Sequence, residues 1–361
     1  MCIRDRADTG VLDVGFWDIT ADYAKSDQDD LTIRVTARNR SDRPATLHVL
    51  PTVWFRNTWS WGDGGARPGL ASTGDRIVAS HERLGVVTLA GSGEPDLLFC
   101  DNESNPDLVP GAGPSQYPKD GINDHVVSGA DTVNPQHTGT KAALWYRLTV
   151  AAGESAAIAV RLSRVGAGPG DLSVLDVRRA EADAFYATLT PADADAEEAA
   201  IMRQAFGGMM WGKQFYHYDV ERWLDGDPGH PPPSPERLGR RNQDWRHLNN
   251  ADVISMPDPW EYPWYAAWDL AFHCIPLARI DPEFAKQQLI LLCREWYMHP
   301  NGQLAAYDGS FHVVNPPVHA WAALRVFQID GGTDFAFLER IVHKLLLNFT
   351  WWVNRKDTEG N

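Results

Sequence analysis

Short runs of alternating apolar and polar residues fill the chain after position 10, as in strands that bury one face. Residues Leu31–Arg38 alternate at period two, and the polar turn 39–44 separates them from Ala45–Arg56. We predict that these two segments form an antiparallel hairpin. The same pattern recurs in Arg76–Ser80, Gly85–Leu89, Ala142–Val150 and Ser155–Leu162. Several short strands joined by Gly, Pro and Asp turns predict an antiparallel β-sandwich.

Residues 101–140 interrupt these strands with a polar stretch rich in Gly, Pro, Asn and Asp. This composition predicts a long loop rather than regular structure. Loops of that length are uncommon in compact domains and are often functional.

The pattern changes at the turn-forming segment 166–171, after which apolar residues recur at helical spacing. An irregular excursion is predicted at 225–258, and no strand pair is expected after residue 171. Helices are predicted at 172–189, 191–218, 263–279, 281–298, 316–328 and 333–354. The fold class is therefore a multi-domain β + α chain. Its expected parts are a β-sandwich domain at 1–165, a linker with a helix at 166–193 and a helical domain at 194–361.

Composition and charge disfavour several classes of partner. The formal net charge of -15 disfavours nucleic acid and anionic membrane surfaces. The N-terminus from Met1 has no signal-like apolar core, and no apolar run is long enough to span a membrane. The four cysteines lack metal-site spacing, and Cys274 and Cys293 are expected to be buried. We predict a cytoplasmic protein with no metal or other cofactor, and the oligomeric state stays open.

The segment Pro259–Asp269 has a high density of aromatic and acidic side chains, with three Trp, two Tyr and two carboxylates in eleven residues. Aromatic faces can cover the apolar faces of sugars, and carboxylates can bind or protonate sugar oxygens. Apolar walls with a few convergent polar groups are typical of small-molecule sites. The alternative is a tryptophan-rich core with one buried Asp. Ten of the fifteen Trp lie after residue 200, which favours the helical part as the ligand-binding part.

Four segments together resemble glycoside hydrolase family 63, in its bacterial mannosylglycerate-hydrolase-like glucosidase branch. These segments are Leu50–Gly62, Trp260–His273, Asn315–Trp321 and Trp351–Asp357. The resemblance implies a β-sandwich followed by an (α/α)6 barrel, of which this chain holds a partial barrel with about six helices. Trehalase-like enzymes share the barrel and a comparable aromatic-Trp-Asp element.

The activity implied by the resemblance is hydrolysis of an α-glycosidic bond with inversion, by an α-glucosidase or a mannosylglycerate-hydrolase-like enzyme. Inversion needs a carboxylic acid and a carboxylate base about 6.5–9.5 Å apart, which leaves room for the attacking water. In the family the acid follows a later Gly-rich segment, which would begin just beyond Asn361. The chain is therefore expected to be a fragment, truncated inside the barrel, that lacks both groups.

The resemblance assigns the aromatic segment to substrate binding. Trp268 and Asp269 are expected to bind hydroxyls of the cleaved sugar, with Asp269 as general acid the less favoured role. Trp264 and Tyr265 are candidate stacking platforms, with helix packing as the alternative. Asn315 is expected to offer its amide to the ligand, or else to cap a helix before Pro316.

For several other residues, a purely structural role competes with a role in binding. We expect His319 to be a core histidine, and Trp59 and Trp61 to pack at a domain interface rather than reach the barrel mouth. The arginines of the excursion are expected to be solvated, although they could bind the carboxylate of a glycerate or lactate aglycone. They are Arg237, Arg240, Arg241 and Arg246.

Two other function classes stay open. One is a non-catalytic carbohydrate-binding or scaffold protein that uses the sandwich and an aromatic patch. The other is an (α/α)6 isomerase or phosphorylase. In the leading interpretation the partner is a small carbohydrate or glycoside.

Overall fold

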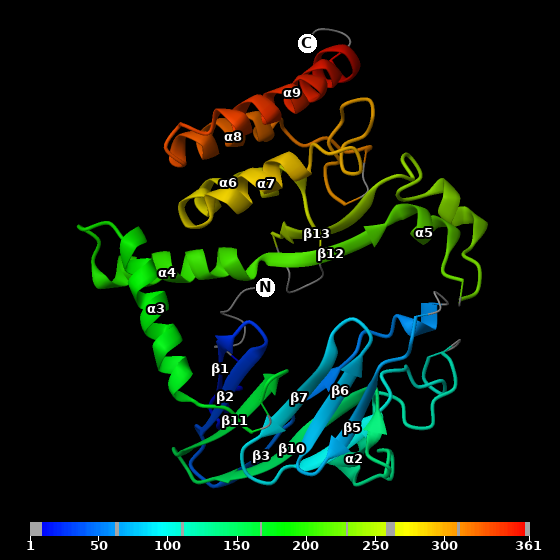
Figure 1. Ribbon diagram of the computed structural model, residues 1–361, viewed down its shortest axis with the longest axis vertical. Coiled ribbons are helices and arrows are strands. Elements are labelled where there is room, and N and C mark those ends of the chain that lie inside the picture. The colour runs from blue at the N-terminus through cyan, green and yellow to red at the C-terminus, as the bar shows by residue number, and fades with distance from the viewer. Residues whose placement is uncertain are drawn as a thin grey trace. The chain divides into compact units, whose positions relative to one another are not determined.

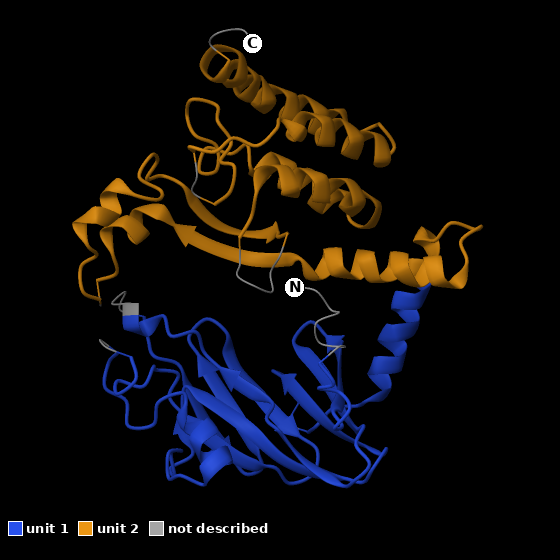
Figure 2. Ribbon diagram, turned by 180° about the vertical axis from the view of Figure 1, so that it is seen from behind, with its two compact units in different colours: residues 1–184 blue, residues 185–361 orange. Residues whose placement is uncertain are grey.

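The computed structural model describes residues 9–61, 65–109, 112–166, 168–228, 230–257, 264–308 and 311–357. The chain forms two compact units, residues 1–184 and 185–361 (Figure 2). The first is rich in antiparallel sheet and the second is largely helical (Figure 1), which confirms the predicted order of β before α.

The larger sheet of the first unit has seven antiparallel strands within the described ranges. In spatial order they are β1 (Trp17–Asp27), β2 (Asp30–Asn39), β11 (Ser155–Ser163), β7 (Gly85–Gly91), β6 (Arg76–His81), β5 (Gly69–Thr73) and β9 (Thr138–Gly139). Strand β2 coincides with the alternation of residues 31–38, whereas the longest strand, β1, lies at the edge of the sheet and was not predicted.

The smaller sheet is centred on β10 (Lys141–Val150). The strands that pair with β10 are β3 (Ala45–Val49), β4 (Thr52–Trp54) and β8 (Asp96–Cys100). Ile77 and Leu89 of the larger sheet share one buried cluster with Phe99 and Leu144 of the smaller sheet. The two sheets therefore pack against each other through their apolar faces.

The predicted hairpin of residues 31–38 with 45–56 is wrong. Strand β2 pairs with β1 and β11, whereas β3 pairs with β10, so the two segments belong to different sheets. Buried Asn39 stabilises the turn that carries the chain from β2 in one sheet to β3 in the other. Its side-chain amide donates to the carbonyls of Arg43 at 2.8 Å and Val150 at 3.0 Å. Alternation indicates which face of a strand is buried, but it does not identify the neighbouring strand.

The predicted loop 101–140 also contains a short helix, α2 (Gly121–Ser128). Ile122 and Val126, one turn apart, pack with Leu98 and Cys100 on the smaller sheet. The helix has three apolar residues, of which only Ile122 and Val126 are one turn apart, and this periodicity is too weak to stand out in a polar stretch.

The α-helices after residue 170, as far as the chain is described, are α3 (Ser173–Leu189), α4 (Ala196–Trp211), α5 (Val220–Asp225), α6 (Ala267–Ile280), α7 (Pro282–Leu291), α8 (Val318–Ile329) and α9 (Phe335–Trp351). A π-helical turn, Trp352–Lys356, continues α9. Polar capping residues fix where two of these helices begin. Asp195 forms a capping box with Glu198 at the start of α4, and Asp281 accepts from the Phe284 amide at 3.0 Å at the start of α7. Helix α7 ends at Leu291, well before the predicted end near Met298.

Helix α6 packs against both α7 and α8 through one large buried cluster. Leu270, Leu277, Leu289 and Ile341 lie at its centre. The nearly buried ammonium of Lys286 on α7 adds a polar clamp, at 3.0 Å from Asp330 and 2.6 Å from Asp334. These two carboxylates follow α8 and precede α9, so one cation joins three helices.

The second unit contains a strand pair that the sequence did not predict. Strand β12 (Lys213–Asp219) pairs antiparallel with β13 (Asn249–Ser255), where we expected the end of a helix and an irregular excursion. Helix α4 stops at Trp211, and the backbone amide of Gly212 closes it. The partner strands are about thirty residues apart in sequence, so local periodicity could not reveal the pairing.

Within the described ranges, no helix has the length and apolar character needed to cross a membrane.

Truncating a side chain at the centre of the helical core should lower the stability of the fold. We expect Leu277→Ala, at a fully buried position of α6, to lower the free energy of unfolding by about 2–5 kcal/mol, because it leaves a cavity. The matched change Leu346→Ala, at an exposed position of α9, should cost less than about 0.5 kcal/mol. Urea denaturation followed by tryptophan fluorescence measures both. Equal losses would show that α6 is not the centre of this core.

Candidate functional site

Three large aromatic side chains form an exposed row on α6 and α8. Trp268 and Phe272 are one helical turn apart on α6, with ring centroids 5.9 Å apart, and Phe272 meets Trp321 of α8 at 5.8 Å. Their exposed fractions are 39%, 43% and 49%. Contiguous exposed aromatic surface of this kind usually marks a binding or interaction site. We call these three residues the aromatic wall.

Two adjoining hollows lie along the aromatic wall. The open one, about 390 Å³, is lined by Phe272, Trp321, Val318 and the Pro316–Pro317 pair. The smaller, about 30 Å³, shares the two prolines and is also lined by Trp268, Asn315, His319, Trp351 and Trp352, with parts of the chain at 304–306. The open hollow is large enough for a monosaccharide, whereas the small one has room for about one water or hydroxyl group.

The small hollow has rigid walls. Asn348 of α9 donates to the carbonyl of Gly302 at 2.8 Å, which holds the segment before 304–306 against α9. Gly302 has a φ of +95°, and a Cβ there would collide with the carbonyl of Leu347. Asn315 donates its amide to the carbonyl of Ala306 at 2.8 Å. Asn315 does not cap the next helix, because α8 begins at Val318 with Pro317 in the cap position.

His319 is buried, as expected, but only half of its ring is satisfied. Nε2 lies 2.7 Å from the carbonyl of Leu289, to which it donates in the neutral ring. The enclosed Nδ1 has no hydrogen-bond partner among the described residues. Burial lowers the pKa of His319, so the ring stays neutral and Nδ1 is an acceptor. His319 therefore adds an acceptor at a residue that lines the small hollow.

Asp269 lies in the first turn of α6, where a negative charge is favourable to the helix dipole. It is half-buried, and it is not among the described residues that line either hollow. Its charge acts on His273: burial lowers the pKa of that ring, and Asp269 partly opposes the shift.

The remaining residues of the aromatic segment divide between core and surface. Tyr265 is fully buried, with Tyr216 and Tyr297 against its ring and Asn250 near its hydroxyl group at 3.2 Å. Trp264 is half-buried. Glu261 and the rest of 258–263 lie outside the described residues.

A buried polar cluster beside Tyr265 was missed by sequence reasoning. Tyr216 of β12 donates its hydroxyl to Asp308, and Arg241 donates to the other carboxylate oxygen of Asp308 at 3.1 Å. Burial raises the pKa of Asp308, while Tyr216 and Arg241 act against the shift. Asp308 follows an irregular segment, so no periodic pattern in the sequence marks it.

The arginines of the excursion already have protein partners. Arg240 pairs with Glu236 at 3.1 Å on the surface, and Arg246 pairs with Asp225 at 2.5 Å. Arg237 donates to the carbonyl of Trp223 at 2.8 Å and lies over its ring. Together with the Arg241–Asp308 pair, these contacts favour a structural role over capture of an aglycone carboxylate.

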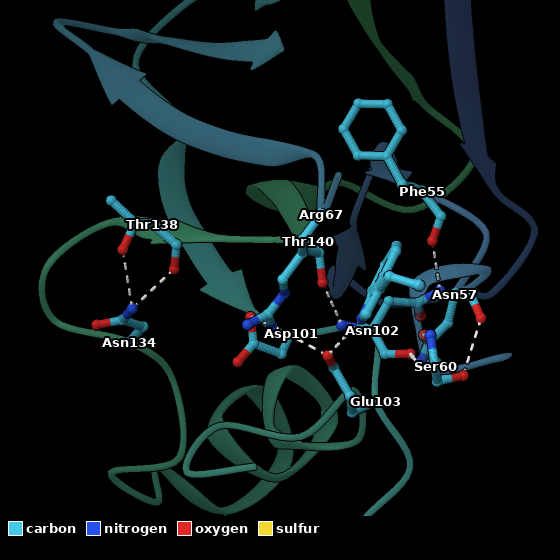
Figure 3. A network of polar contacts seen from close by, with 11 residues as sticks. Phe55, Asn57, Ser60, Arg67, Asp101, Asn102, Glu103, Asn134, Thr138 and Thr140 are labelled. Carbon is cyan, nitrogen blue, oxygen red and sulfur yellow. Dashed lines mark hydrogen bonds and ion pairs between the residues drawn. The ribbon is translucent and has the colours of Figure 1, made fainter. Parts of the chain in front are cut away.

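In the first unit, the segment Leu50–Gly62 supplies β4 and the start of a polar network (Figure 3). Glu103 accepts from the Trp59 indole at 2.9 Å and pairs with Arg67 at 3.0 Å. Asn102 donates its backbone amide to Thr140 and its side chain to the carbonyl of Phe55, at 2.7 and 2.8 Å. The network fixes the chain after β4 against the start of β10. Gly62 lies outside the described residues.

Comparison with known proteins finds a family match in the helical part. Residues 262–361, which contain α6 to α9 and the aromatic wall, match the family described as "Mannosylglycerate hydrolase MGH1-like glycoside hydrolase domain". This part of the chain is similar to a glycoside hydrolase domain. That confirms the resemblance at this level.

A relative from Saccharomyces cerevisiae, "Uncharacterized protein YMR196W", is 43% identical over 408 aligned residues. The match covers 98% of this chain but only 37% of the yeast protein. The chain thus spans a little more than a third of the length of this relative.

The buried His319 should make the helical unit acid-sensitive. Its folded pKa lies below the unfolded value of about 6.5, so the neutral ring contributes stability above that pH. This contribution is lost as the pH falls through the unfolded pKa toward the folded one. We expect His319→Gln to flatten the loss of stability between about pH 7 and about pH 5, leaving the part due to His273.

Urea denaturation at a series of pH values measures this slope. The exposed His247→Gln is the matched control and should leave the slope unchanged. An identical slope in His319→Gln and the parent chain would contradict the assignment.

Proposed function

We propose that the aromatic wall is part of the sugar-binding site of an α-glycoside hydrolase. The observation that carries this proposal is the open hollow of about 390 Å³ lined by Phe272 and Trp321, inside the segment similar to a glycoside hydrolase domain. The aromatic faces would cover the C–H face of a pyranose, and the small hollow beside Trp268 would take one of its hydroxyl groups.

Each residue of the site has a proposed role. Trp268, Phe272 and Trp321 form the apolar surface, and Trp264 extends it. Asn315 orients a hydroxyl group through its amide oxygen, since the amide nitrogen is engaged by Ala306.

Asp269 binds hydroxyls at the cleaved end of the sugar from the first turn of α6, and general acid is its less favoured role. Because Tyr265 is enclosed in the core, we propose no sugar contact for it.

The proposed chemistry is inverting hydrolysis, as in α-glucosidases and mannosylglycerate-hydrolase-like enzymes. It needs an acid with a raised pKa and a base about 6.5–9.5 Å away. We propose that both groups come from parts of the protein beyond these 361 residues. The much greater length of the yeast relative supports this arrangement.

The exposed apolar side chains of α8 and α9 fit the same proposal. They include Leu324, Val342, Leu346, Leu347 and Phe349. An apolar face of this extent is normally covered by protein. We propose that further helices of an (α/α)6 barrel cover it. We also propose the cytoplasm as the compartment, where the buried, free Cys100, Cys274 and Cys293 would remain reduced.

Removing the central indole should weaken binding of a neutral sugar. We expect Trp268→Ala to raise the Kd for methyl α-D-glucopyranoside about 5- to 30-fold, equivalent to about 1–2 kcal/mol, because the apolar face that covers the ring is lost. Ligand-observed NMR titration measures the effect. Phe335→Ala, an exposed aromatic outside both hollows, is the matched control and should bind like the parent chain. A Kd unchanged in Trp268→Ala would remove the sugar assignment.

Catalysis separates the hydrolase from a non-catalytic binding protein. The 361-residue chain should show no release of p-nitrophenol from its α-glucoside above the buffer rate, because neither acid nor base is supplied. The full-length yeast relative should hydrolyse an α-glucoside or α-mannoside. Turnover by the 361-residue chain would contradict the placement of the catalytic groups. Sugar binding without hydrolysis by the full-length relative would favour the non-catalytic alternative.

A further inference from the structure

A second hollow, of about 430 Å³, lies on the outer face of the smaller sheet in the first unit. Trp54 ends β4 and stands directly opposite Lys141 on β10, and Lys141 stands opposite Cys100 on β8. Residues opposed across antiparallel strands project from the same face. Helix α2 packs on this face beside Cys100, so the hollow has a floor of sheet and a wall of helix. We call it the Trp54 hollow.

The lining of this hollow combines an aromatic platform with apolar and polar groups. Trp54 is 58% exposed, although it belongs to a sheet. Leu50, Ile122 and Val126 supply apolar wall, and Asn102 and Asn123 supply amides. Asn102 is held in place by the network of Figure 3.

Two lysines supply positive charge. Lys141 donates from Nζ to the carbonyl of Lys119 at 2.7 Å, and both residues line the hollow. Burial lowers the pKa of Lys141, and the nearby Lys119 charge lowers it further, while Cys100 and Asp120 oppose the shift. Within the described ranges, neither ammonium forms an ion pair with a carboxylate, although Asp120 lies nearby. An anion bound here would offset the repulsion between the lysines.

We propose that the Trp54 hollow binds an anionic sugar, with the ring on Trp54 and the acidic group against Lys141 and Lys119. The apolar wall and exposed indole suit a pyranose face, and the two lysines that line the same hollow suit a carboxylate or phosphate. The chain has a net charge of -15, so a local pair of cations is needed to attract an anion to its surface. This proposal is independent of the proposed function, because it concerns the other compact unit.

Isothermal titration calorimetry on the 361-residue chain tests the proposal with four probes. Methyl glucuronide and glucose 6-phosphate present a carboxylate and a phosphate on the same kind of ring. Methyl α-D-glucopyranoside is the neutral analogue, and inorganic phosphate is the anion without a ring. We expect one anionic sugar to bind at least tenfold more tightly than both the neutral sugar and inorganic phosphate, with an affinity that falls as salt rises. The favoured probe identifies the acidic group.

Substitutions of residues that line the Trp54 hollow test whether the anionic sugar binds there. Lys141→Met and Lys119→Met should each reduce the preference for the anionic sugar about fivefold or more, and Trp54→Ala should weaken its binding to a similar degree. Lys119 is exposed, so its substitution tests the charge without disturbing the sheet. Lys25→Met, an exposed lysine on β1, is the matched control and should change nothing.

Three results would overturn the proposal. They are equal affinities for the anionic and neutral sugars, binding of inorganic phosphate as tight as that of the favoured anionic sugar, and full retention of the preference in both folded lysine variants. Loss of anionic-sugar binding in Trp268→Ala alone would assign the ligand to the aromatic wall instead.

Discussion

Burial of the inner stripe of α6 against α7 and α8 determines where the aromatic wall lies. Leu270, Cys274 and Leu277 enter the core together, and Trp268 and Phe272 must then project from another face of the same helix. Because α8 packs on α6, Trp321 meets Phe272 edge to face. The exposed aromatics are therefore a consequence of the core, and their spacing is as rigid as the helix pair that carries them.

The small hollow shows how polar groups can be placed in an apolar setting. Burial keeps His319 neutral, and the carbonyl of Leu289 fixes which nitrogen carries the proton. The carbonyl of Ala306 does the same for the amide of Asn315. In each case a backbone carbonyl engages the donor side of the group, and the enclosed Nδ1 of His319 is left without a hydrogen-bond partner among the described residues.

The sequence was informative where structure is local. The alternation of residues 31–38, the cap at Asp281 before α7 and the helix at 173–189 all followed from short-range pattern and were confirmed. Strand pairing does not depend on local pattern. Strands β2 and β3 belong to different sheets, and β12 pairs with β13 although about thirty residues separate them. Periodicity cannot encode such partners, since it records burial and not the neighbour.

The candidate site divides in the same way. Aromatic density made Trp268 a candidate for substrate binding, and Trp268 lines the small hollow. Tyr265, three residues earlier and before the start of α6, is fully buried in the core, and aromatic density alone does not distinguish these two outcomes. Asp308 and the unsatisfied nitrogen of His319 depend on contacts between distant segments, so only the folded chain reveals them.

The Lys286 clamp has a practical consequence. Its amine lies against the carboxylates of Asp334 and Asp330, in the segment that joins α8 to α9, and these two groups raise its pKa. An acylating reagent attacks an uncharged, accessible amine, so this lysine should react only when the segments separate. The extent of its labelling is therefore an internal gauge of whether the helical cluster is intact.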